Sequence, residues 1–236
     1  NIFVIKKIIN FNMRTCFSRE FFDTLRDIRL NNNRDWYLVN KSRVSDARNE
    51  MEEFANSLIP LVRKFDKNIG QLDAKETMYK QHRDIRFSPD KTPYKSYISS
   101  VLFYGSKRMG GNIPCYYLHL EDGSGMIAGG VHAPEPQTLK KIREEIFYNV
   151  DEFKSIINKK EFVKYFKTIN SEDRLKTAPK GFPKDWEDID LLRNKEYCPA
   201  FFFDIDKAMD KDFLYFVEDA YKSIRDLNEF LFRAIS

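Results

Sequence analysis

Cysteine is scarce in this sequence. Among 236 residues there are three, an odd number, at positions 16, 115 and 198. Because they lie far apart and form no CxxC pair, they outline neither a disulfide framework nor a zinc site. This usage fits a reducing compartment, and we expect a cytoplasmic protein.

Long apolar runs are also missing. No segment approaches the run of about 18 apolar residues that a membrane-spanning helix requires, so we expect no membrane protein. The first residues are partly apolar, but Lys6 and Lys7 interrupt them and no small-residue cleavage site follows, which disfavours a secretory signal. The recognisable pattern begins near Phe17. We therefore expect residues 1–16 to be an N-terminal extension, with Met13 as a candidate native start, and residues 17–236 to form a single domain.

Nucleotide-binding loops are lacking too. No Walker loop occurs in the sequence. Residues 123–128 read GSGMIA, which matches the glycine-rich dinucleotide fingerprint, but two more glycines and two prolines follow where a helix should begin. We interpret this segment as a hairpin turn. The net charge is only +4, so any attraction to nucleic acid must come from a local patch.

Apolar and aromatic residues are plentiful, at 42% and 15%, and are arranged with helical spacing at both ends of the chain. Ser18 is a candidate N-cap for a first helix that ends near residues 31–33, and Pro60 should kink or end the long second helix. The apolar stripe of that second helix is Val44, Ala47, Met51, Phe54, Leu58, Leu61 and Phe65. The C-terminal stripe is Phe213, Val217, Ala220, Ile224, Leu227 and Leu231.

The middle of the chain predicts a sheet. Seven of the nine glycines lie between Gly105 and Gly130, among short runs of β-branched and aromatic residues. We predict strands at residues 97–104, 115–121, 126–131 and 197–204, with residues 122–125 as a hairpin turn and a helix that begins at Pro136. In residues 115–121 the odd positions should form a polar face and the even positions a core face. The expected fold is α+β, with a mainly antiparallel sheet bracketed by N-terminal and C-terminal helices.

The densest polar segment is residues 82–95, HRDIRFSPDKTPYK. Arg83 and Arg86 could clamp a phosphate or carboxylate, Lys91 and Lys95 could neutralise it, and Tyr94 could pack or donate a hydrogen bond. Two prolines would hold the loop in one shape and lower the entropy lost on binding. These five residues are our candidate ligand site.

An internal role explains the same segment. Asp84 and Asp90 could pair with neighbouring basic residues and fasten an irregular loop onto the sheet. Both interpretations stay open at this stage.

The segment RDIRFSPDKTPYK resembles the signature of domain-of-unknown-function family 2461, a group of uncharacterised bacterial and fungal proteins. The resemblance extends from Phe17 to the C-terminus, through FSREFFDTLRDIRLNNNRDWYLVNK, CYYLHLEDG, APEPQTLKKIR and LKTAPKGFPKDWEDIDLLRNKEY. One departure is Pro89, where the family more often has a lysine, so one charge of the candidate anion site is missing. The resemblance implies a shared fold and a shared polar loop, and it supplies no activity.

Several other residues could carry chemistry. Asp204 and Asp206 follow an apolar run and could hold a hard cation, although an Asp that caps the next helix explains them as well. His119 and His132 could approach each other across the hairpin, and His119 beside Glu121 could act in acid–base catalysis. A second basic region contains Lys176, Lys180, Lys184, Arg193 and Lys195. Acidic residues dilute it, and we expect a solvated surface.

The sequence therefore favours a protein that binds a phosphate- or carboxylate-bearing small molecule through residues 82–95. The alternative is a module that binds nucleic acid or a protein partner with the same loop. No nucleophile, cofactor site or metal site stands out, and neither an enzymatic activity nor an oligomeric state follows from these residues.

Overall fold

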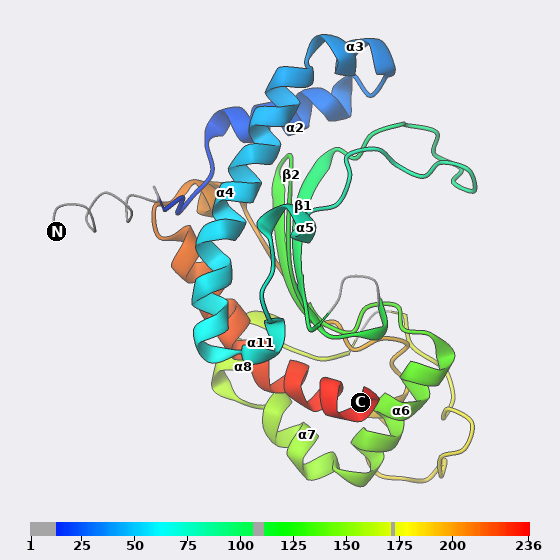
Figure 1. Ribbon diagram of the computed structural model, residues 1–236. Coiled ribbons are helices and arrows are strands. Elements are labelled where there is room, and N and C mark those ends of the chain that lie inside the picture. Colours follow the sequence, from blue (N-terminus) through cyan, green and yellow to red (C-terminus); the bar gives the residue numbers. More distant parts are fainter. Residues whose placement is uncertain (1–12, 106–110, 171–172) are drawn as a thin grey trace, which may run out of the picture.

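The computed structural model describes residues 13–105, 111–170 and 173–236 (Figure 1). Residues 1–12, which make up most of the predicted extension, lie outside the described residues. Helices and a sheet share one core, and the chain has the predicted α+β architecture. Among the residues whose positions are described, none of the helices combines the length and the apolar character that a membrane crossing needs.

The N-terminal helices are α2 (Arg19–Leu30), α3 (Arg34–Val39) and α4 (Lys41–Phe65). Helix α2 begins as predicted, because the Ser18 hydroxyl accepts a hydrogen bond of 3.1 Å from the amide of Phe21. Helix α4 continues through Pro60 to its end, so the expectation that Pro60 could end it was wrong. Proline has no backbone N–H, so the carbonyl of Asn56 lacks its usual helical hydrogen bond. Asn56 is exposed, and water can donate to this carbonyl instead.

The described strands form one antiparallel sheet in the order β1-β2-β3-β4. Their bounds are β1 (Tyr97–Phe103), β2 (Cys115–Glu121), β3 (Ser124–Gly130) and β4 (Ala200–Phe203). Glu121 pairs with Ser124, so the hairpin turn consists of Asp122 and Gly123 and is shorter than predicted. The last strand is also shorter than predicted, because Tyr197 makes only an isolated bridge to Val131.

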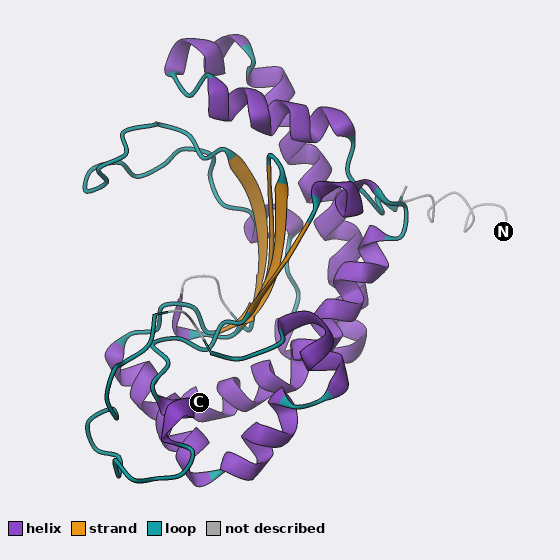
Figure 2. Cartoon of the chain, turned by 180° about the vertical axis from the view of Figure 1, so that it is seen from behind, coloured by secondary structure: helices purple, strands orange, loops and turns teal. Residues whose placement is uncertain are grey.

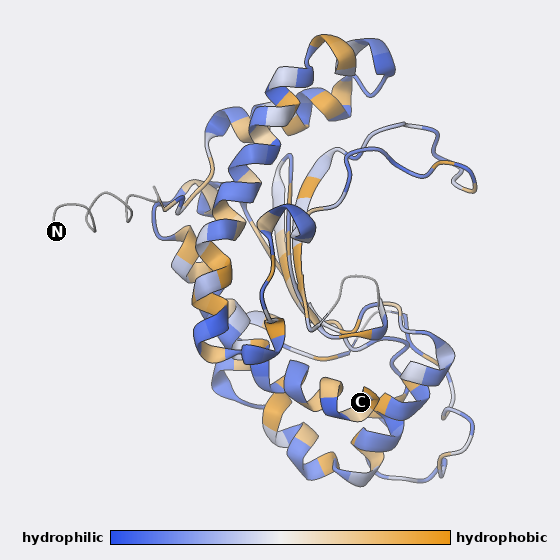
Figure 3. Ribbon diagram, viewed as in Figure 1, coloured by the Kyte–Doolittle hydropathy of each residue, from blue (hydrophilic) through white to orange (hydrophobic). Residues whose placement is uncertain are grey.

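Helices cover one face of this sheet. Helix α4 packs against β1, and the C-terminal helix α11 (Phe213–Ile235) packs against β3 and against α4 (Figure 2). Hydrophobic and hydrophilic residues alternate along α4, as a helix with one buried side requires (Figure 3). The even-numbered residues of β2 (Tyr116, Leu118 and Leu120) are fully buried beneath this layer. The odd-numbered residues point to the opposite face, which no described helix covers.

The remaining helices pack around the end of α11 or connect the strands. Helices α6, α7 and α8 contact α11, and Pro136 occupies the first turn of α6 as predicted. Their bounds are α6 (Pro136–Tyr148), α7 (Val150–Ile157) and α8 (Lys160–Phe166), and the shorter elements are η1 (Lys67–Ile69), α5 (Ala74–Thr77), α9 (Ile189–Leu192) and α10 (Ile205–Met209).

A buried carboxylate fastens the end of α4 to the sheet. Asp66 is 1% exposed and follows the last residue of the helix. Its side chain accepts hydrogen bonds from the hydroxyl of Tyr104 and, at 2.5 Å, from the hydroxyl of Tyr116. The second carboxylate oxygen caps η1 through the amide of Asn68, at 3.0 Å. A buried carboxylate with three donors is satisfied, and it fixes where the helix layer meets β1 and β2.

Gly130, at the end of β3, is expected to tolerate no side chain. Its φ is +115°, and a Cβ there would lie 2.0 Å from the carbonyl oxygen of Tyr197. We predict that Gly130→Ala lowers the free energy of unfolding by roughly 3 kcal/mol or more, because positive φ and a backbone clash add up.

The matched control is Gly123→Ala. Gly123 has a φ of +87°, but a Cβ added there would meet nothing within 4 Å, so the cost should be that of the backbone conformation alone. We expect about 1 kcal/mol. Urea denaturation of both variants measures the difference, and equal losses would show that the approach of Tyr197 does not matter.

Candidate functional site

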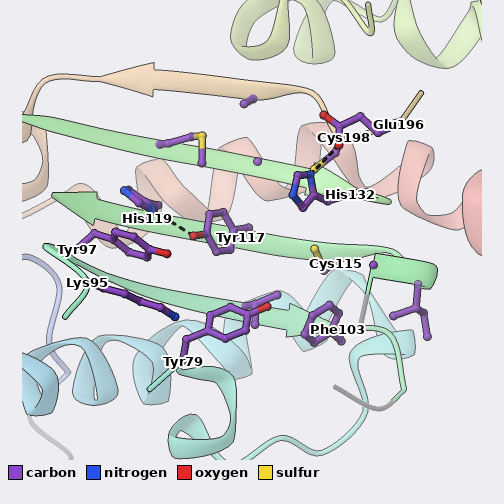
Figure 4. Close-up of a pocket in the computed structure, with 16 residues that line it drawn as sticks. Tyr79, Lys95, Tyr97, Phe103, Cys115, Tyr117, His119, His132, Glu196 and Cys198 are labelled. Atoms are coloured by element: carbon purple, nitrogen blue, oxygen red, sulfur yellow. Dashed lines mark hydrogen bonds and ion pairs between the residues drawn. The ribbon is translucent and has the colours of Figure 1, made fainter. Parts of the chain in front are cut away.

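A cavity of about 570 Å³ lies on the open face of the sheet (Figure 4). Its floor is formed by β1, β2 and β3, and its two ends by residues that precede β1 and that follow β3 or precede β4. The side chains that line the cavity include Tyr79, Lys95, Tyr97, Cys115, Tyr117, His119, His132, Glu196 and Cys198. Because side chains alternate along a strand, the register of β1 and β2 places their odd-numbered residues together in this cavity.

A row of polar side chains follows β2, from Tyr117 and His119 in the floor to Glu121 at the end of the strand. The Tyr117 hydroxyl lies 3.1 Å from Nδ1 of His119, and Nε2 of His119 lies 3.7 Å from a carboxylate oxygen of Glu121. Tyr97 of β1 stacks on the His119 ring with a centroid distance of 4.3 Å. The imidazole is therefore held from two sides, and its side chain is 16% exposed.

Burial shifts the titration of these groups. It lowers the pKa of His119 below its ordinary value of 6.5, although the nearby Glu121 carboxylate opposes the shift. Burial also raises the pKa of Tyr117 to about 12. At neutral pH the imidazole is consequently neutral and the phenol keeps its proton.

Lys95 lies at one end of the cavity among aromatic rings. Its Nζ is 4.9 Å from the ring centre of Tyr79 and 5.6 Å from that of Tyr97. Both distances fall within the range in which the face of an aromatic ring attracts a cation. Burial raises the pKa of both tyrosines, so the rings carry no charge at neutral pH.

The other end of the cavity combines an imidazole, a carboxylate and two thiols. Nδ1 of His132 lies 2.7 Å from Glu196, which also accepts the amide of Ala133 at 3.1 Å. Burial raises the pKa of Cys115 to about 12 and also raises that of Cys198, so both are thiols at neutral pH. Within the described ranges, no group of three or more His, Cys, Asp or Glu side chains is placed to hold a metal ion.

Residues 80–96 form an extended arm that leaves the sheet on the side opposite to α4 (Figures 1 and 2). Backbone hydrogen bonds join its two limbs, from Arg83 to Pro93 at 2.9 Å and from Lys95 to Gln81 at 2.8 Å. All five predicted site residues belong to this arm, and Arg83, Arg86 and Lys91 have partners within it.

The two arginines of the predicted site are paired with aspartates. The Arg83 guanidinium contacts Asp90 and the Thr92 hydroxyl, and Arg86 binds Asp84 in a bidentate pair with N–O distances of 2.9 and 2.6 Å. These pairs match the predicted alternative in which the aspartates fasten the loop internally. The amide of Thr92 and, after it, the Arg83 guanidinium lower the pKa of Asp90 to about 2.

The remaining members of the predicted site diverge. Lys91 donates to the carbonyl of Ile85 at 3.0 Å, and Tyr94 is buried against Tyr37 with a centroid distance of 3.8 Å. Of the five residues, all within the described ranges, Lys95 alone lines the cavity. An anion clamp made by all five together remains a prediction.

The secondary candidates occupy structural positions. Asp204 caps α10 by accepting the amide of Asp206 at 2.9 Å, which is the capping role expected as the alternative to metal binding. In the second basic region, Lys195 pairs with Asp173 and Arg193 with Asp190.

Sequence reasoning missed Tyr79, Tyr97, Glu196 and Cys198 as cavity residues. The alternation in residues 115–121 correctly indicated that Tyr117, His119 and Glu121 share a face. It carried no signal for the loop residues at the two ends, whose positions depend on the path of the chain beyond the strands.

The comparisons with known proteins add a family. The model of a family of conserved hypothetical proteins, DUF2461, matches residues 20–230. The chain belongs to this family. The DUF2461 match includes the arm and all strands of the cavity floor, and it confirms the resemblance inferred from the sequence. No curated protein and no solved structure matches the chain.

We predict that His119 titrates below 6.5 and that Glu121→Gln lowers its pKa further, because the substitution removes the carboxylate that favours the imidazolium. The C2 proton of His119 in an NMR pH titration measures both values. Glu144→Gln, at a half-buried position of α6 that does not line the cavity, is the matched control and should leave the His119 pKa unchanged. A rise of the His119 pKa in Glu121→Gln would contradict the geometry of the row.

We also predict that the Asp90 carboxyl titrates near 2 and that Arg83→Gln moves it part of the way to 3.8. The amide of Thr92 should retain the rest of the shift. Since the folded pKa is lowered, the contribution of Asp90 to the order of the arm is complete above 3.8 and is lost as the pH falls toward 2. Carboxyl ¹³C shifts measure the titration.

The control for Asp90 is Arg86→Gln, which removes the partner of Asp84 and should leave Asp90 as it is. If the pKa of Asp90 were the same in Arg83→Gln as in the wild type, Arg83 would not be held by Asp90 and would be available to an external anion.

Proposed function

We propose that the protein binds a small molecule that carries a carboxylate or phosphate group on a planar, aromatic body. The ligand occupies the cavity on the open sheet face, with its anionic group next to Lys95. The observation that carries this proposal is the position of the Lys95 ammonium over Tyr79 and Tyr97, at the end of a cavity with an aromatic floor.

The size and lining of the cavity support such a ligand. Its volume of about 570 Å³ falls within the range of small-molecule sites, which are mostly apolar with a few polar groups that fix orientation. The stacked rings of Tyr97 and His119 offer a flat apolar surface to a planar molecule. The ammonium then selects for a negative group at one end.

The arm supports a second candidate, a contact with nucleic acid or a protein partner. Phe87 near the tip of the arm is 93% exposed, and the Arg86 guanidinium lies 5.8 Å from its ring centre. Exposed aromatic and cationic side chains together can stack on unpaired bases. The acidic partners Asp84 and Asp90 reduce the charge of the arm, which makes this the weaker proposal.

We predict that benzoate and phenyl phosphate bind the cavity and that Lys95→Gln weakens each by about tenfold, the effect of losing one charged contact. Isothermal titration calorimetry gives the affinities, and ring-proton shifts of His119 report where the probes bind. Benzamide, which lacks the charge, should bind weakly to both proteins.

Lys91→Gln is the matched control, because Lys91 lies on the arm and donates to a backbone carbonyl. It should bind both probes like the wild type. If Lys91→Gln and Arg86→Gln weaken binding while Lys95→Gln does not, the anion site lies on the part of the arm outside the cavity. Binding of a single-stranded oligonucleotide that falls steeply with salt and is lost in Phe87→Ala would favour the second candidate.

A further inference from the structure

We propose that Tyr117, His119 and Glu121 form a proton relay that removes a proton from a phenol-type hydroxyl of the bound ligand. This inference rests on the proposed function, because the ligand occupies the same cavity. It adds a reaction step to what would otherwise be a binding site.

The relay follows from the alternation of one strand. Residues 117, 119 and 121 of β2 project to the same face, and pairing with β1 and β3 fixes their order. Hydroxyl, imidazole and carboxylate succeed one another at 3.1 Å and 3.7 Å. A proton acceptor oriented by a third group is the arrangement used by enzymes that activate a hydroxyl.

The Glu121 carboxylate sets the tautomer of the neutral imidazole. Its oxygen lies 3.7 Å from Nε2 of His119, and a carboxylate favours a proton on the ring nitrogen that faces it. Nδ1 then carries no proton and accepts the hydrogen bond of the Tyr117 hydroxyl, at 3.1 Å. In this state His119 is a base with its accepting nitrogen already linked to a hydroxyl in the cavity.

The proposed step moves two protons. The ligand O–H bond breaks and its proton bonds to the Tyr117 oxygen, while the Tyr117 hydroxyl proton passes to Nδ1 of His119. The electron pair stays on the ligand oxygen as a phenolate. Tyr117 is regenerated as a phenol, His119 becomes an imidazolium with protons on both nitrogens, and Glu121 stabilises that new charge.

Burial keeps the His119 imidazole neutral before the step, and the Glu121 carboxylate is the neighbour that favours the imidazolium after it. Tyr97 and Ser99 face it from β1, Met126 faces it from β3, and the titratable neighbours on β2 are Tyr117 and Glu121. A nearby cation is Lys95, whose ammonium lies 5.6 Å from the centre of the Tyr97 ring that stacks on His119, so it can stabilise a phenolate in the cavity.

The test uses 4-nitrophenol, whose phenolate absorbs in the visible range and whose phenol does not. At a pH below its ionisation in water, we expect the wild-type protein to bind the probe largely as phenolate. In Tyr117→Phe and in Glu121→Gln the ratio of bound phenolate to phenol should fall by about tenfold, equivalent to about one pKa unit. Glu144→Gln, outside the cavity, should match the wild type.

The outcomes separate the two proposals. If neither benzoate nor 4-nitrophenol binds, the proposed function fails. If benzoate binds but 4-nitrophenol does not, or binds with the same ionised fraction in all four proteins, the relay is overturned and the binding site stands.

A second measurement needs no variant. The ¹⁵N shifts of the His119 ring in the free wild-type protein should show a proton on Nε2 and none on Nδ1. The reverse tautomer would overturn the relay, because Nδ1 could not then accept the Tyr117 proton.

Discussion

Burial of one face of the sheet determines where the functional groups of this protein lie. Helices α4 and α11 take up the even-numbered side of β2, and no helix in the described parts of the chain takes up the other side. A strand sends successive side chains to opposite faces, so each residue that strengthens the core has a neighbour committed to the cavity. Leu118 lies in the core, and the same alternation places its neighbours Tyr117 and His119 in the cavity. A slip of one residue in register would exchange the two sets.

That division requires the helix layer to be held firmly, since this layer buries the even-numbered side chains of β2. Asp66 supplies one fixed point, with Tyr104 and Tyr116 as donors from the edge of β1 and from β2. The cost of burying its charge is offset because three donors replace water. Gly130 supplies a second fixed point. The backbone of Tyr197 lies close against it, which brings the segment before β4 onto the sheet. Glu196 and Cys198 flank that contact and thereby reach the cavity.

The fold could be predicted from the sequence further than the site could. The Ser18 cap, the stripes of α4 and α11 and the alternation of β2 are local patterns, and local patterns survive in the structure. Pro60 does not end α4, because tertiary packing of the helix outweighs a single lost hydrogen bond on an exposed side. The site depends instead on what covers the sheet. Tyr79 and Glu196 lie far apart in sequence, and no spacing rule brings them to the same cavity.

The charged arm shows why density of charge is a poor guide to a binding site. Its arginines have aspartates two and seven residues away, and such short-range pairs form within the loop itself. An anion that binds there must compete with a carboxylate held at a high effective concentration. Lys95 has different surroundings, because its ammonium lies against the rings of Tyr79 and Tyr97, whose faces attract a cation. In the proposed function, a ligand anion at this position would gain a charge contact in a partly desolvated cavity, where such a contact is stronger than on the exposed arm.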